Sequence, residues 1–183
     1  MSLARAFIAI GSNIDAEENV SRALRSLARR VQVRAVSTVC RTAAIARPEQ
    51  PPYCNCVAEI ATSLEPAELK RCVLRPIETQ LGRKRTTDKF AARTIDLDLI
   101  AYGDIRLREG GLVLPDPEIA ARPFLAIALA ELAPELLIPD AGGTAREIAA
   151  GMSHEEMLPL VEFTERLRRE LRDEQGKRAA ARA

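Results

Sequence analysis

Two aspartates alternate with aliphatic residues in the stretch ARTIDLDLI, residues 92–100. A period of two predicts a β-strand, because successive side chains of a strand point to opposite faces of a sheet. Asp96 and Asp98 therefore share one face. The opposite, apolar face is made by Ile95, Leu97 and Leu99. The strand is either half-buried with an acidic outer face or part of a metal site, because a cation such as Mg²⁺ offsets the repulsion between adjacent carboxylates.

The order of the predicted elements limits the fold further. Apolar spacing predicts strands over 5–11, 31–40, 53–63 and 94–101, and helices over 15–30 and 63–82. This order is that of the ferredoxin-like βαββαβ plan, an α+β fold with helices on one face of an antiparallel sheet. We expect the other face to be left to solvent or a ligand. Pro76 should interrupt the second helix.

The remaining chain predicts helices added after this core. An apolar helix is expected from about Pro123, and a short helix follows it. In the tail, a helical stripe is formed by Leu160, Thr164, Leu167 and Leu171. The last eight residues offer nothing to bury, and we expect them to be frayed, with Gly176 weakening any helix there. The predicted division is a main domain over 1–159 and a helical, partly disordered extension over 160–183.

Charge and apolar patterning exclude several classes of protein. The 27 Lys and Arg residues balance 26 Asp and Glu residues, so no net field favours general binding of nucleic acid or an anionic membrane. The sequence has no apolar run of about 18 residues and no signal-peptide pattern after Met1. We therefore expect a cytoplasmic, monomeric protein that binds small molecules.

Cysteine and histidine chemistry is not favoured. The four cysteines lack the paired Cys-x-x-Cys spacing of a zinc site, and the single histidine, His154, lies far from them in the chain. Nothing places that histidine beside a nucleophile, as a Ser-His-Asp or Cys-His mechanism requires. Cys54 and Cys56 are expected to pack as small core residues on the strand face opposite Tyr53 and Asn55.

A basic segment leads into the acidic strand. Within RKRTTDKFAAR, residues 83–93, the cationic residues are Arg83, Lys84, Arg85, Lys89 and Arg93. Guanidinium groups chelate phosphate oxygens, and a pair of carboxylates holds the Mg²⁺ that bridges the same phosphates. The combination favours a site for a metal–polyphosphate ligand over a solvated loop.

Several segments, in order along the chain, closely resemble the hydroxymethyl-dihydropterin pyrophosphokinase family of the folate pathway. The resemblance runs from about Ala6 to about Pro159. It rests on AFIAIGSN (6–13), RTAAI (41–45), PYCN (52–55), IETQLGRKR (77–85) and KFAARTIDLDLIAYG (89–103). The Arg-x-x-Asp-x-Asp segment with its basic lead-in is far more specific than Asp-x-Asp alone.

The resemblance implies a ferredoxin-like core and transfer of the terminal pyrophosphoryl group of ATP to the pterin hydroxymethyl oxygen, which releases AMP. Asp96 and Asp98 are then expected to bind two Mg²⁺ ions, with Arg83 and Arg93 also in catalytic roles. Nucleotide contacts are expected from Arg85, Phe90, Asp116 and Arg122. Pterin contacts are expected from Thr42, Ala43, Ile45, Tyr53, Asn55 and Phe124. Glu78 resembles a supporting acidic position without an assigned role.

The resemblance also implies that the loop carrying Arg83, Arg85, Phe90 and Arg93 closes over ATP. We expect this loop to be mobile without ligand, because its basic side chains have no partner before the triphosphate arrives. Three positions depart from the family pattern: Asp116 replaces a histidine, Phe90 a tryptophan and Ala92 a frequent proline. None of them is an expected metal ligand.

Two other functions share parts of this pattern. An RNA-binding module has the same strand order, but it stacks bases on sheet aromatics, and this chain has only four Phe and two Tyr. A catalytically silent pterin or nucleotide sensor on the same fold is compatible with Asp116. Turnover of ATP to AMP separates the enzyme from such a sensor.

Overall fold

A computed structural model describes residues 3–88 and 90–180, with side chains up to residue 176. Its largest sheet is antiparallel, with the strand order β10-β3-β4-β1-β5, and β2 also pairs with β4. The strands are β1 (Ala4–Ser12), β2 (Gln32–Val36), β3 (Cys40–Thr42), β4 (Tyr53–Thr62), β5 (Asp96–Tyr102) and β10 (Leu158–Pro159). This arrangement confirms the predicted ferredoxin-like α+β core.

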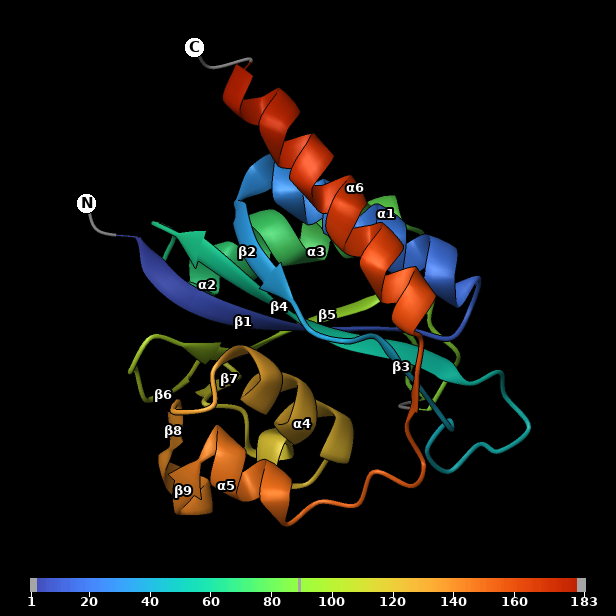
Figure 1. Ribbon diagram of the computed structural model, residues 1–183, viewed down its shortest axis with the longest axis vertical. Coiled ribbons are helices and arrows are strands. Elements are labelled where there is room, and N and C mark those ends of the chain that lie inside the picture. The colour runs from blue at the N-terminus through green and yellow to red at the C-terminus, as the bar shows by residue number, and fades with distance from the viewer. Residues whose placement is uncertain (1–2, 89, 181–183) are drawn as a thin grey trace.

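Helices cover one face of the sheet, on the upper side in Figure 1. They are α1 (Ala16–Arg30), α2 (Pro66–Leu69), the π-helix η1 (Lys70–Leu74), α3 (Arg75–Gln80) and α6 (Val161–Ala180). The predicted helix over 63–82 is thus three consecutive segments. The return from π to α geometry falls at Arg75, next to Pro76, whose missing N–H cannot complete a regular ladder.

The main hydrophobic core lies between these helices and the sheet. Ile95, Leu97 and Leu99 of the acidic strand are at most 2% exposed and belong to this core, as predicted. Cys54 and Cys56 are buried in the same core, which confirms their expected packing. Because side chains alternate along a strand, the residues between them face the other side of the sheet.

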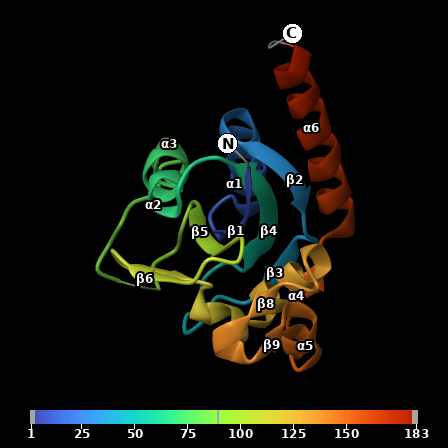
Figure 2. The ribbon, with the colours of Figure 1, turned by 90° about the vertical axis from the view of Figure 1, so that its left-hand side faces the viewer.

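The second face of the sheet is not simply open, contrary to the expectation. Helices α4 (Pro123–Leu132) and α5 (Ala145–Ala150) lie below it in Figure 1 and on the side opposite α1 and α6 in Figure 2. A second apolar cluster joins Phe7, Val57 and Ile100 of the sheet to these helices. The intervening short elements are β6 (Leu107–Glu109), β7 (Leu112–Leu114), η2 (Pro117–Ala120), β8 (Leu137–Ile138), η3 (Pro139–Ala141) and β9 (Gly143–Thr144).

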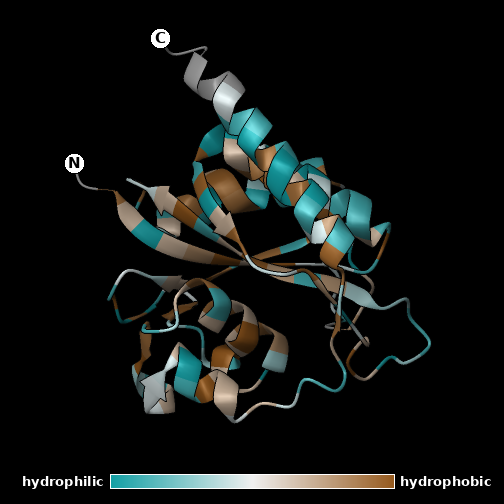
Figure 3. Cartoon of the chain, in the orientation of Figure 1, coloured by the Kyte–Doolittle hydropathy of each residue, from teal (hydrophilic) through white to brown (hydrophobic). Residues whose placement is uncertain are grey.

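Helix α6 packs its predicted stripe on the main core. Thr164, Leu167 and Leu171 are buried, and the outward surface of the helix is largely hydrophilic in Figure 3. The backbone is helical to Ala180, so the expected fraying from Gly176 is not found in the described part of the tail. Two contacts hold the helical turn just before Gly176. Glu174 pairs with Arg29, and Gln175 donates to the Val33 carbonyl. The domain boundary at residue 160 stays a prediction.

No helix in the described ranges 3–88 and 90–180 is long and apolar enough to cross a membrane.

Candidate active site

A cavity of about 690 Å³ opens on the second face of the sheet. Strands β1, β4 and β5 contribute to it together with the β3–β4 loop, residues 116–125 and residues 153–157. Its size lies within the roughly 300–1,000 Å³ of typical small-molecule sites. The predicted site residues that line it are Thr42, Ile45, Tyr53, Asn55, Phe90, Arg93, Asp96, Asp98, Asp116, Arg122 and Phe124.

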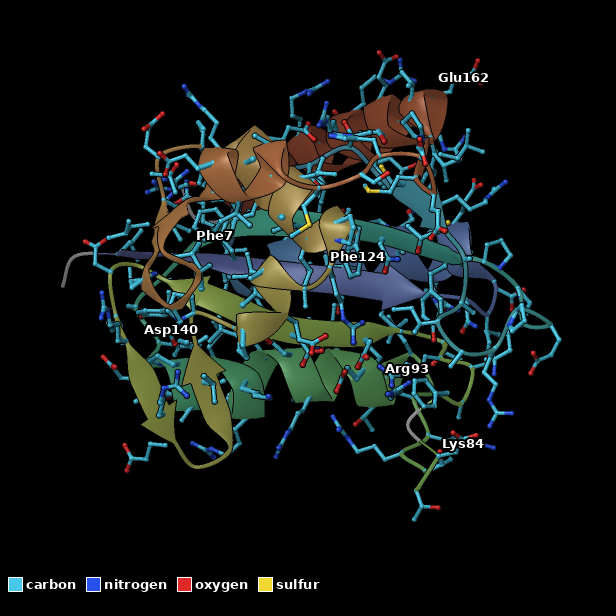
Figure 4. All side chains as sticks on the ribbon, turned by 90° about the horizontal axis from the view of Figure 1, so that it is seen from below. Phe7, Lys84, Arg93, Phe124, Asp140 and Glu162 are labelled. Atoms are coloured by element: carbon cyan, nitrogen blue, oxygen red, sulfur yellow. The ribbon has the colours of Figure 1, made fainter. Side chains whose placement is uncertain are left out.

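The cavity spans two layers of the molecule. In Figure 4, Phe124 at the start of α4 lies over the central strands, and Arg93 lies toward one end of the sheet. Lys84 lies farther out, at the outer edge of its loop. The strand, loop and helix residues that the sequence analysis grouped are therefore brought to one site, although they lie far apart along the chain.

Asp96 and Asp98 both face the cavity from β5, while Leu97 between them points into the core. The Asp98 side chain is exposed to the open cavity, yet the surrounding protein limits its hydration. This burial raises the pKa of Asp98, and the neighbouring charge of Asp96 raises it further. The pair thus carries the mutual repulsion that a bound cation offsets.

Asp96 is paired with two arginines of the basic segment. Arg83 Nη2 lies 3.5 Å from Asp96 Oδ1, and Arg93 Nη1 donates to Asp96 Oδ2. Arg93 lines the cavity, whereas Arg83 is placed beside it with only 12% of its side chain exposed. Arg93 is also fixed through its backbone, because its N–H donates to Asn13 Oδ1 at 2.6 Å.

Glu78 supports the acidic strand from α3. This buried carboxylate accepts a 3.1 Å hydrogen bond from the Leu97 backbone N–H, which lies between the two aspartates. Its other oxygen accepts a 2.7 Å bond from Arg85 Nη2. Burial raises the pKa of Glu78, and nearby Asp96 adds to this shift. Glu78 therefore fixes the strand that carries the aspartates.

We expected the basic loop to be mobile because its basic side chains would lack partners without ATP, and this reason is wrong in part. Arg83, Arg85 and Arg93 each pair with a carboxylate of the chain, so they do not lack partners before ATP binds. Arg85 and Ala43 are not among the residues that line the cavity, and Lys89 lies outside the described residues. The mobility of the loop itself stays a prediction.

Another part of the cavity wall, across β1 from Asp96, has a fixed polar pair. Asn55 Nδ2 donates to Thr42 Oγ1 at 2.8 Å, and Asn55 is only 7% exposed. Tyr53 and Phe124 add aromatic rings to the same cavity, and burial raises the pKa of the Tyr53 phenol. An amide that both donates and accepts, flanked by aromatic rings, suits a flat heterocycle with a polar edge.

Asp116 and Arg122 already have partners within the chain. Asp116 Oδ1 caps η2 by accepting from the Glu118 backbone N–H at 2.8 Å. Burial raises the pKa of Asp116, while that hydrogen bond lowers it. Arg122 precedes α4 and pairs through its Nε with Glu118. Asp116, Glu118 and Arg122 all line the cavity, so this part of its wall carries two carboxylates and one guanidinium group.

Sequence reasoning missed other parts of the cavity wall. These residues include Gly11, Gln50, Glu118, Ser153, Glu155, Glu156 and Met157. Residues 153–157 lie in an irregular link between α5 and α6, where no period or spacing indicates a site. Gly11 stands within the quoted AFIAIGSN segment, and its place in a strand was the one available signal.

The carboxylate pair fits Mg²⁺ by its donor chemistry. Within the described residues, no three acidic, cysteine or histidine side chains are grouped to hold a metal by themselves. Mg²⁺ does not need such a cage, because proteins usually bind it through one or two carboxylates together with substrate phosphates and water. Asp96 and Asp98 supply that number of hard oxygen donors on one face of the cavity.

The sequence profile of the 7,8-dihydro-6-hydroxymethylpterin-pyrophosphokinase family matches residues 7–134. A 2-amino-4-hydroxy-6-hydroxymethyldihydropteridine pyrophosphokinase of Synechocystis is 38% identical over 142 residues, covering 76% of this chain and 71% of the relative. The enzyme of the same name from Methylorubrum extorquens is 35% identical over 151 residues, with 81% and 93% covered. The Pseudomonas aeruginosa relative is 34% identical, with 74% and 85% covered.

Solved structures of Plasmodium falciparum HPPK-DHPS share the fold. The wild-type chain with pteroate matches with a TM-score of 0.63 at 11% identity, and the match covers 81% of this chain. The same protein with pterin and p-hydroxybenzoate matches with a TM-score of 0.62 at 11% identity. This chain spans 44% and 43% of those two chains. At such identities the likeness establishes the fold alone.

Together, fold, cavity and relatives define a small-molecule kinase, a transferase with ATP as its co-substrate. The chain belongs to the 7,8-dihydro-6-hydroxymethylpterin-pyrophosphokinase family. It is the enzyme of folate synthesis that transfers a pyrophosphoryl group from ATP to 6-hydroxymethyl-7,8-dihydropterin. The alternative of an RNA-binding module is thereby excluded, and the sequence resemblance is confirmed.

Proposed function

We propose that this one cavity holds both substrates, with the pterin beside Thr42 and Asn55 and the triphosphate near Asp96 and Asp98. The observation that carries the proposal is that the carboxylate pair and the Thr42–Asn55 pair line the same cavity of about 690 Å³. Pyrophosphoryl transfer needs the accepting hydroxyl and the triphosphate side by side. One cavity whose polar aromatic part lies across a single strand from its acidic part meets that requirement.

In this proposal the pterin ring packs between aromatic side chains and meets a fixed amide. Asn55 presents its carboxamide to the pyrimidinone edge, and its bond to Thr42 holds the amide in place. Tyr53 and Phe124 supply the rings, and Ile45 closes the open side. Ala43, next to Thr42, does not line the cavity, so we assign it no contact with the pterin.

The nucleotide is assigned to the basic residues of the cavity. Arg93 and Arg122 line it directly and offer guanidinium donors to phosphate oxygens. Phe90 gives an apolar contact, and Asp116 acts through the helix cap that places Arg122 nearby. Arg83 and Arg85 contact the triphosphate only after they leave Asp96 and Glu78.

Asp96 and Asp98 are the residues that would hold Mg²⁺, and we expect two ions. Bound Mg²⁺ neutralises triphosphate charge and lowers the pKa of a coordinated hydroxyl. Glu78 holds the strand between the two aspartates, so their positions are set before any ligand arrives. Arg93 balances the charge of Asp96 in the free enzyme and is available to phosphate oxygens once that aspartate has another cation.

An assay of the purified chain tests this proposal. We expect AMP and the pterin diphosphate to form from ATP and 6-hydroxymethyl-7,8-dihydropterin in the presence of Mg²⁺. A chelator should stop the reaction, and added Mg²⁺ should restore it. Asn55→Ala should raise the pterin KM, because it removes the amide proposed to meet the ring, while Asn55 has no proposed contact with ATP. An Asn55→Ala enzyme with a normal pterin KM would contradict this placement of the pterin.

The monomeric state and the cytoplasmic location stay predictions. Sedimentation of the purified enzyme at several concentrations measures the first. Fractionation of cells that express the full chain measures the second.

A further inference from the structure

Gly11 occupies a central place on the floor of the cavity. It lies near the end of β1, where its register partner on one side is Asn55 of β4 and on the other side is Asp96 of β5. Gly11 itself lines the cavity. A residue without a side chain therefore stands between the amide proposed for the pterin and the carboxylate proposed for the metal.

Space, and not backbone conformation, explains the glycine. Gly11 is not among the glycines with positive φ, so an L-residue can adopt its backbone conformation. A Cβ added there would lie 2.6 Å from Asn55 Oδ1, closer than side-chain carbons approach such an atom. The next nearest atoms, Asn55 Cγ and Tyr53 Cδ1, are 3.8 Å away, which is ordinary contact. The Asn55 carboxamide thus occupies the volume that any other side chain at position 11 would fill.

The carboxamide is held on its other side by Thr42. Asn55 Nδ2 donates to Thr42 Oγ1 at 2.8 Å, so the amide nitrogen is directed to β3 and the amide oxygen to Gly11. In this orientation the Thr42 hydroxyl accepts, and because a hydroxyl can also donate, either terminal amide atom could face Thr42. An added Cβ at position 11 collides with whichever of the two faces Gly11. Two neighbours therefore determine one orientation: Thr42 by a hydrogen bond and Gly11 by the space it leaves.

We infer that Gly11 is a positioning residue for the pterin, because its missing side chain lets the Asn55 carboxamide lie in the orientation that recognises the ring. The inference rests on the proposed function, in which Asn55 meets the pterin. Gly11 makes no contact with ATP in this account, and its influence passes through Asn55 alone.

Gly11→Ala should leave the fold intact, because the added methyl collides with the far end of one side chain and not with backbone. The carboxamide must rotate away, and its hydrogen bonds to the pterin are weakened. We expect the pterin KM to rise about tenfold, as for the loss of one or two hydrogen bonds. The ATP KM and the melting temperature should stay close to those of the natural enzyme.

The decisive experiment is a double-mutant cycle with Gly11→Ala, Asn55→Ala and both together. Pterin KM, ATP KM, kcat and melting temperature are measured for each enzyme. In the Asn55→Ala background, Gly11→Ala should add nothing, because the atom it collides with has been removed. Gly176→Ala is the matched control, since a Cβ there meets no atom within 4 Å. Its pterin KM, ATP KM and kcat should match those of the natural enzyme, and its melting temperature should not fall, because alanine favours a helix more than glycine does.

Each other outcome has a definite meaning. A normal pterin KM in Gly11→Ala, with a raised one in Asn55→Ala, would overturn the role of Gly11 and leave the pterin placement standing. A normal pterin KM in Asn55→Ala would overturn both. An equal effect of Gly11→Ala in the two backgrounds would show that it does not act through Asn55. If Gly11→Ala lowers the melting temperature, and the double variant with Asn55→Ala does not restore it, the added methyl collides with the backbone and not with the Asn55 side chain. That result would overturn the inference.

Discussion

Asp96 and Asp98 stand on the same strand face but differ in their partners. Asp96 is paired with Arg83 and Arg93, whereas the pKa of Asp98 is raised by burial and by Asp96 itself. A metal ion at the pair would relieve the repulsion at Asp98 and compete with the arginines for Asp96. The same event would weaken the pairs that Arg83 and Arg93 make with Asp96, beside the place proposed for the triphosphate.

We predict that Asp96→Ala and Asp98→Ala each lower turnover on the order of a thousandfold or more, as for other electrostatic anchors of a transition state. The fold should be preserved, because both side chains face the cavity and not the core. Steady-state AMP formation and melting temperature are the measurements. Asp173→Asn, at an exposed position on α6, is the control and should have normal activity. Near-normal turnover in either alanine variant would contradict the metal assignment.

The aspartate pair could be predicted from the sequence, whereas the role of Glu78 could not. Alternation along one strand fixes which neighbours share a face, so Asp96 and Asp98 follow from local pattern alone. Glu78 reaches the Leu97 backbone from α3, 19 residues away, and this contact depends on how α3 packs on β5. For the same reason the sequence could not show that Asn55 lies against Gly11.

At the scale of elements, the two loops around the cavity are joined by one glutamine. Gln50 of the β3–β4 loop accepts from Asn13 Nδ2 at 3.1 Å and donates to the Phe90 carbonyl at 2.9 Å. An exposed ion pair between Arg47 and Asp88, at 3.1 Å, joins the same loops. Exposed pairs contribute little, so the link through Gln50 and the buried Asn13 is the main one. The proposed pterin and nucleotide loops are therefore mechanically connected.

We predict that Gln50→Ala loosens the basic loop and raises the KM of both substrates severalfold, because one amide serves both loops. Hydrogen exchange over residues 83–93 should be faster in the free variant than in the natural enzyme. It should slow in both when ATP analogue and pterin bind. Gln32→Ala, at an exposed position of β2, is the matched control. Unchanged exchange in the Gln50 variant would show that the loops are held by other contacts.

Helix α5 offers a pH-dependent test of local stability. Thr144 and Glu147 form a capping box, and the hydrogen bonds from Thr144 lower the pKa of Glu147. A lowered folded-state pKa stabilises the protein above the unfolded pKa, and this contribution is lost as pH falls through the folded pKa. Glu147→Gln should therefore lower the melting temperature slightly at pH 7 and have no effect well below the Glu147 pKa. An equal difference at both pH values would contradict the capping role of the charge.

The elements predicted from the sequence were correct in type and order, but the sequence did not show every point at which an element is broken. The expected strand over 31–40 is two strands, β2 and β3. Between these two strands, the Val57 backbone N–H donates to the Ser37 hydroxyl at 2.9 Å. A side-chain oxygen thus takes the place of a backbone carbonyl in the hydrogen bonding between strands. Serine hydroxyls compete with backbone acceptors in this way, and propensity alone does not show where they succeed.

At the scale of the whole molecule, α6 joins layers on opposite faces of the sheet. Arg168 donates to the Val36 carbonyl at 2.7 and 3.0 Å and pairs with Glu131 of α4 at 2.8 Å. Glu131 in turn accepts from the Thr38 backbone N–H at 2.8 Å, on the segment that leads to β3. The tail is thus tied to the helix and the strand that carry Phe124 and Thr42. Its apolar stripe was predictable, but this polar link was not, because its contacts join residues 37, 93 and 132 positions apart.

Truncation of the tail tests its structural role. Deleting residues 160–183 removes Phe163, Leu167 and Leu171, which are at most 6% exposed in the main core. Each buried side chain of this size contributes roughly 1.5–3 kcal/mol, so the free energy of unfolding should fall by several kcal/mol. Deleting only 176–183 should change neither melting temperature nor turnover, because α6 is anchored up to Gln175.

If the longer truncation does not yield folded protein, Leu167→Ala provides the same comparison at one residue. It should cost about 2–5 kcal/mol of stability, as for other buried leucines. Arg172→Ala, an exposed position on the same helix, is its control and should be nearly neutral. Denaturant unfolding measures both variants, and AMP formation at low temperature shows whether the folded fraction keeps its activity. An unchanged melting temperature for the longer truncation would show that α6 is an appendage, whereas lost activity in the shorter one would place residues 176–183 at the site.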